Sequence, residues 1–164
     1  MVLSHSHEVR KKFQMAQNSY KISYMEHTIP PCFYRLSVKA LIHNKEWKFL
    51  LIKERNNLWE LPGGWVDYRE DIKDCLRREV KEEMWLKVIS VWQRPEYFYT
   101  SKNLKWYHIS NVLYETEVEN YNFIPSEECI EIGFFNLTEA KKLETYPNIQ
   151  EFLKYYNPEN HVHL

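Results

Sequence analysis

Three glutamates in one short segment carry the clearest chemical signal of the sequence. In residues 70–84 the apolar side chains recur at helical spacing and predict a helix with one inward-facing stripe. That stripe consists of Ile72, Cys75, Leu76 and Val80. Glu79 and Glu83 fall inside the stripe, and Glu82 lies at its edge. Since desolvating an unpaired carboxylate costs several kcal/mol, the pattern predicts a bound cation, and hard oxygen ligands favour Mg²⁺ or Mn²⁺.

The competing interpretation is a solvated helix face of mixed charge, which Arg77, Lys81 and Glu82 alone would fit. The inward phase of Glu79 and Glu83 favours the metal site instead. The preceding loop adds to this, because two successive glycines allow backbone carbonyls to approach an ion.

The loop and the helix together match a known motif. Gly64 is followed after five residues by Glu70 and after seven more by the run Arg78 to Glu83, and Leu86 closes the segment. This arrangement resembles the Nudix box, G-x5-E-x7-R-E-U-x-E-E-x-G-U, in which U is a bulky aliphatic residue. The run 58–63 is similar to the lead-in of that family, and the strands expected at 34–52 and 128–135 are similar to its flanking strands.

The resemblance implies an α/β fold, specifically an α/β/α sandwich with a mixed β-sheet, and hydrolysis of a nucleoside diphosphate linked to another group. It assigns Glu79, Glu82 and Glu83 to the metal, together with the carbonyl of Gly63. Glu79 would also act as the base, directly or through metal-bound water. Divalent cations would neutralise the diphosphate oxygens and stabilise charge on the leaving group.

Further residues take supporting roles in the resemblance. Arg78 would orient Glu79 or Glu82, and Glu70 would support that arrangement. The family often adds an acid from a late loop. Glu128, six residues before Phe134, fits that position, with Glu127 as the alternative.

The sequence departs from the motif at Trp85, which stands where the family has its last glycine. That glycine normally ends the helix in a left-handed conformation, which strains a large residue. Either the helix ends there at a cost, or it continues and buries the indole. We expect the chain to have adapted by the second route, so that glycine at this position would destabilise it.

The elements that must position these groups follow from the apolar patterns. Residues 34–42 alternate with period two, and residues 47–52 are nearly continuously apolar, which is typical of a strand covered on both faces. Further strands are expected at 59–61, 87–92, 106–115 and 131–135, and helices at 138–144 and 149–156. The predicted organisation is an N-terminal arm at 1–30 with a short helix or loose chain at 8–18, a Nudix domain at 31–157, and a frayed tail at 158–164.

Candidate substrate contacts are less specific. Arg35 and Lys39 lie on the polar face of the first strand, Lys53 follows the second, and Trp65 follows the glycines. The basic side chains could meet phosphate. Aromatic rings could stack a base, although core packing is the commoner role of any one ring. The rings in question are Trp65, Tyr97, Tyr99 and Trp106.

The bulk properties narrow the class of protein. A net charge of −1 gives no broad basic field, which counts against a 5′-end RNA pyrophosphohydrolase or decapping activity without excluding it. Three scattered cysteines and no long apolar run favour a cytoplasmic protein that does not bind membranes. The expected partner is a small nucleotide, with a homodimer left open. A catalytically silent nucleotide-binding module is the third alternative, and the histidines show no metal spacing.

Overall fold

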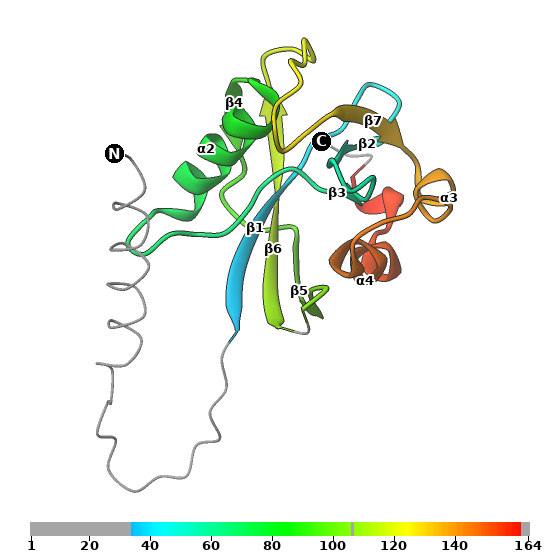
Figure 1. Ribbon diagram of the computed structural model, residues 1–164. Coiled ribbons are helices and arrows are strands. Elements are labelled where there is room, and N and C mark those ends of the chain that lie inside the picture. Colours follow the sequence, from blue (N-terminus) through cyan, green and yellow to red (C-terminus); the bar gives the residue numbers. More distant parts are fainter. Residues whose placement is uncertain (1–33, 106, 162–164) are drawn as a thin grey trace, which may run out of the picture. The chain divides into compact units, whose positions relative to one another are not determined.

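The structure is a computed structural model that describes residues 34–105 and 107–161. The arm predicted at 1–30, Trp106 and residues 162–164 lie outside this part. The elements, in chain order, are β1 (Arg35–Leu41), β2 (Phe49–Lys53), β3 (Trp59–Glu60), α2 (Ile72–Met84), β4 (Val88–Val91), β5 (Tyr97–Lys102), β6 (His108–Val118), β7 (Glu131–Phe135), α3 (Leu137–Ala140), α4 (Pro147–Tyr155) and the 3-10 helix η1 (Pro158–Asn160) (Figure 1).

The strands form two sheets. In the four-stranded sheet, β6 pairs in parallel with β1 and antiparallel with β4 and β5. The three-stranded sheet has the order β3-β2-β7 and is antiparallel. Helix α2 lies on one side of the β1–β6 pair, and α3 and α4 lie toward the other (Figure 1). The expected α/β sandwich with a mixed sheet is therefore confirmed.

Two apolar cores explain the composition of the strands. Leu50 and Ile52 pack in the core that α2 covers, whereas Phe49 and Leu51 pack in the core that α3 and α4 cover. Strand β2 is thus buried on both faces, as its continuous apolar run predicts. None of the helices in the described ranges is long and apolar enough to span a bilayer.

Helix α2 is bounded at both ends by local chemistry. The side chain of Asp71 caps its first turn by accepting from the amides of Lys73 and Asp74. The helix ends at Met84, and Trp85 adopts a left-handed conformation with φ 57° and ψ 22°. The indole is 61% exposed. The expectation that the helix continues and buries this ring is therefore wrong.

Three other expectations differ from the structure. Strand β5 was not expected, because its consecutive aromatic residues give no clean alternation and its partner strand lies beyond a turn. Helix α3 is shorter than expected, since only Leu137–Ala140 is helical. The chain at 158–161 is not frayed: His161 is fully buried.

Candidate active site

The loop at 62–64 runs beside β1 and is held by backbone hydrogen bonds. The amide of Val38 donates to the Gly64 carbonyl (2.9 Å), and the amide of Ala40 donates to that of Pro62 (2.8 Å). Gly63 has φ 117°, and a Cβ there would lie 2.3 Å from the Val38 oxygen. Only glycine fits this backbone and this spacing.

Gly64 leaves space for a carboxylate. A Cβ at this position would lie 2.4 Å from Cδ of Glu79 and 2.5 Å from both of its oxygens. The Glu79 side chain is therefore packed against the loop backbone. Burial raises its pKa, and hydrogen bonding from Arg78 opposes that rise.

Arg78 joins three glutamates through its guanidinium. Nε and Nη2 donate to the two oxygens of Glu70 at 2.7 and 2.9 Å, a bidentate pair that is geometrically strong. Nη1 donates to Glu79 at 2.8 Å and to Glu82 at 3.2 Å. The hydrogen bonds from Arg78 lower the pKa of Glu70 to about 2. The fork fixes Glu79 relative to the loop.

Glu83 is buried below the same loop. The Gly63 amide donates to its Oε2 at 2.9 Å. Burial raises the pKa of Glu83 well above its ordinary value, although the charge of Lys39 opposes this. The ammonium of Lys39 donates to the Gly63 carbonyl and lies 3.6 Å from Glu60, so a cationic group already contacts the carbonyl expected to bind metal.

Lys39, Glu79, Glu83 and the two loop glycines line one cavity of about 510 Å³. Five of its lining residues are acidic, namely Glu54, Glu60, Glu79, Glu83 and Glu128. Burial raises the pKa of Glu60 as well as those of Glu79 and Glu83, even with Lys39 among them. The charge of Lys39 therefore does not offset the effect of burial on these carboxylates. The donor set, oxygen atoms from carboxylates and a carbonyl, fits a hard divalent cation.

Only some of the other predicted contact residues line this cavity. Arg35, Lys39 and Trp65 line the cavity, with the Arg35 guanidinium 4.1 Å from the Trp65 ring centroid. Lys53 is not among its lining residues, because its ammonium pairs with Glu131 at 3.3 Å. Glu82 also lies outside the lining. It borders a neighbouring groove together with Glu128 and Trp85.

The aromatic residues suggested for base stacking divide in the same way. Trp65 lines the cavity, whereas Tyr97 and Tyr99 pack against Phe152 in the core covered by α4. Trp106 falls outside the described residues. Tyr107, which was not singled out, contributes to the lining and is exposed.

The polar lining residues that were not predicted from the sequence include Glu54, Glu60, Asn111 and Asn148. Glu54 directly follows β2, and Glu60 is the last residue of β3. Polar residues at the ends of buried strands often belong to binding or catalytic sites. Asn111 lies in β6 with its amide bonded to Ser101, while its Oδ1 is buried without a hydrogen-bond partner among the described residues. A polar residue within a buried strand was the available signal.

The chain is similar to known proteins in sequence and in fold. The NUDIX domain family model matches residues 33–156. The chain is 32% identical over 82 residues to an 8-oxo-dGTP diphosphatase of Buchnera aphidicola, covering 47% of this chain and 66% of that protein. It is 28% identical over 111 residues to an ADP-ribose pyrophosphatase of Methanocaldococcus jannaschii, covering 62% of each. The chain thus spans about two thirds or less of these curated relatives.

A solved structure shows the same arrangement of elements. The MutT protein of Methanosarcina mazei superposes with a TM-score of 0.63 at 27% identity, covering 80% of this chain and 98% of that one.

Proposed function

Because the chain belongs to the Nudix family, we propose that it is a pyrophosphohydrolase that cleaves a diphosphate linkage in a nucleotide, with the aid of Mg²⁺ or Mn²⁺. The substrate would be a nucleoside triphosphate or a nucleoside diphosphate joined to another group.

One observation carries this proposal. Glu79 and Glu83 lie beside the Gly63–Gly64 loop in a single cavity, and burial raises the pKa of both. Burial of two carboxylates destabilises the metal-free protein, and a bound cation would compensate that cost. A diphosphate, which itself carries negative charge, binds to such a site as a metal complex.

The residues that would hold the cation are Glu79, Glu82 and Glu83, with the Gly63 carbonyl as a fourth oxygen ligand. When bound, the metal would neutralise the diphosphate and lower the pKa of water. Glu82, being half-exposed, would need to turn toward the cavity. Lys39 would release the Gly63 carbonyl and contact phosphate or Glu60 instead.

The reaction needs a base for the attacking water. Glu79 is held by Arg78, and burial raises its pKa, which makes the carboxylate a stronger base. Glu128 also lines the cavity and is the second candidate. In either case the water oxygen bonds to phosphorus, the bridging P–O bond breaks, and the carboxylate takes the proton.

The rest of the cavity would receive the nucleoside. Trp65 offers a ring and Arg35 a positive charge, while the unpartnered Oδ1 of Asn111 can accept a hydrogen bond from a base or sugar. The relatives named for 8-oxo-dGTP and ADP-ribose both act on purine nucleotides. Purine nucleotides are therefore the first compounds to test.

The experiment is a product-release screen with Mg²⁺ over nucleoside triphosphates, ADP-ribose, nucleotide sugars, dinucleoside polyphosphates and capped RNA. We expect hydrolysis of at least one small nucleotide and its loss on exhaustive chelation. Glu79→Gln should lower kcat by about 100-fold or more. Nucleotide binding without turnover of any compound would overturn the enzyme and support a binding module, and turnover of capped RNA alone would support the RNA alternative.

A further inference from the structure

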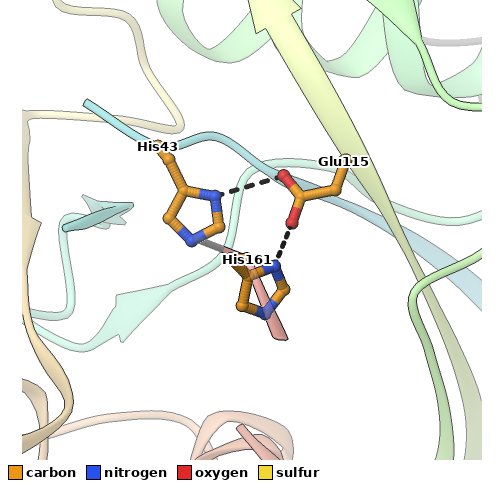
Figure 2. A group of neighbouring side chains, drawn as sticks. All are labelled: His43, Glu115 and His161. Carbon is orange, nitrogen blue, oxygen red and sulfur yellow. Dashed lines mark hydrogen bonds and ion pairs between the residues drawn. The ribbon is translucent and has the colours of Figure 1, made fainter. Parts of the chain in front are cut away.

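A second cluster of ligand-type side chains lies outside the cavity described above. It combines His43, which follows β1, Glu115 from β6 and His161 after η1 (Figure 2). One nitrogen from each imidazole and a carboxylate oxygen all lie within 4.8 Å of one another. Figure 2 shows both rings directed at the two oxygens of Glu115, with Nδ1 of His43 3.1 Å from Oε2 and Nδ1 of His161 2.6 Å from Oε1.

The cluster is buried, and the far nitrogen of each imidazole has a hydrogen-bond partner. The side chains of His161 and Glu115 are 1% and 8% exposed. Nε2 of His43 is 3.0 Å from the Tyr156 hydroxyl, and Nε2 of His161 is 2.8 Å from that of Tyr97. A hydrogen bond at the far nitrogen is the usual support of a metal-binding imidazole, because it fixes both the tautomer and the ring orientation.

One contact inside the cluster is unusual. Although Nδ1 of His161 and Oε1 of Glu115 are only 2.6 Å apart, neither atom has a directed hydrogen-bond partner among the described residues. The two atoms form a buried ion pair without a hydrogen bond, and a cation ligated by both of them would satisfy them.

A cavity of about 350 Å³ reaches both His43 and Glu115 from the surface, and it offers a path for an ion and water.

From these contacts we infer that His43, Glu115 and His161 form a binding site for Zn²⁺, separate from the carboxylate site of the Nudix motif. Two imidazoles and one carboxylate form a set that suits Zn²⁺ rather than Mg²⁺, and water from the cavity would complete a tetrahedron. Because the three ligands come from the chain after β1, from β6 and from the chain after η1, the ion would fix residue 161 to the sheet.

The test uses the full chain freed of metal and then given excess MgCl₂, so that Mg²⁺ competes for the carboxylate site. We expect addition of ZnCl₂ to leave one tightly bound Zn²⁺ per chain and to raise the melting temperature by about 5 °C. X-ray absorption at the zinc edge should show imidazole ligands. His161→Ala and the nearly isosteric Glu115→Gln should lose the bound ion and the shift.

His108→Ala is the matched control, since His108 is exposed and lies outside the cluster. It should keep the ion and the shift, and Glu82→Gln should as well, which would separate this site from the Nudix motif. Circular dichroism checks that each variant is folded. If His161→Ala does not fold, the test rests on Glu115→Gln. Failure of the wild type to retain Zn²⁺, or equal retention by folded Glu115→Gln, would overturn the inference and leave a hydrogen-bonded network only.

Discussion

At the scale of single residues, the candidate site is a set of charges that the protein alone does not balance. Glu83 illustrates this, because it is almost fully buried and its contacts with the protein are the Gly63 amide and the charge of Lys39. A buried carboxylate of this kind destabilises the metal-free protein and is stabilised when the cation binds. This trade-off between stability and function is common at binding sites.

We therefore expect Glu83→Gln to lower kcat by about 100-fold or more and yet to stabilise the metal-free protein by on the order of 1–3 kcal/mol. The amide oxygen can still accept from Gly63, while the buried charge is gone. Activity assays and denaturant melts in EDTA measure the two effects. Glu82→Gln is the matched control for stability, because its half-exposed carboxylate should give a change near zero. A destabilised Glu83→Gln protein would contradict the assignment.

The stability difference between these proteins should also depend on pH. The folded-state pKa of Glu83 is raised, so the stability that its protonated form contributes is present below the unfolded pKa of about 4.3 and is lost as the pH rises through the folded value. Melting temperatures in EDTA from pH 4 upward should therefore show a gap between Glu83→Gln and wild type that widens with pH. A constant gap would mean that Glu83 does not titrate over this range.

At the scale of elements, the sequence predicts what local rules determine. The phase of Glu79 and Glu83 on α2, the alternation of β1 and the two-sided burial of β2 are all readable because helical and strand periods act over a few residues. The arrangement of distant partners is not readable in this way. Glu60 with Asn148 and His161 with Glu115 meet only through sheet pairing and the packing of α4.

The end of α2 shows how a local rule and a tertiary context can conflict. The sequence allows either a left-handed Trp85 or a longer helix, and abundant aromatic neighbours favoured the longer helix. The structure instead ends the helix, with the Trp85 amide donating to the Lys81 carbonyl and the ring left exposed. Trp85 thus adopts the left-handed conformation that glycine favours at a helix end.

This geometry reverses the effect expected from the sequence for Trp85→Gly. Glycine pays no Cβ penalty at φ 57°, and little buried area is lost, so the variant should be more stable by about 1 kcal/mol with kcat nearly unchanged. Trp85→Ala is the control, since it removes the ring but keeps the Cβ and should gain much less. Denaturant melts of the three proteins give the answer, and a less stable glycine variant would show that the indole packs favourably.

At the scale of the whole molecule, the candidate site is assembled from residues of several elements. The Gly63–Gly64 loop pairs with β1, Glu79 and Glu83 come from α2, and Glu128 precedes β7. No one of these segments holds a complete set of ligands. A cation at this site would bind the folded chain and have little affinity for the unfolded one.

Metal binding should therefore appear as stability, independently of any substrate. At a free Mg²⁺ concentration about 100 times its dissociation constant, the wild type should gain about 2.7 kcal/mol, which corresponds to a rise of about 5–10 °C in melting temperature. EDTA should reverse the rise, and KCl of equal ionic strength should not reproduce it, because screening alone does not bridge the carboxylates. Glu83→Gln should lose most of the rise, while Glu131→Gln, which removes an exposed carboxylate outside the cavity, should keep it. Equal Mg²⁺ shifts in the wild type and Glu83→Gln would place the cation elsewhere and remove the physical basis for assigning hydrolysis to this cavity.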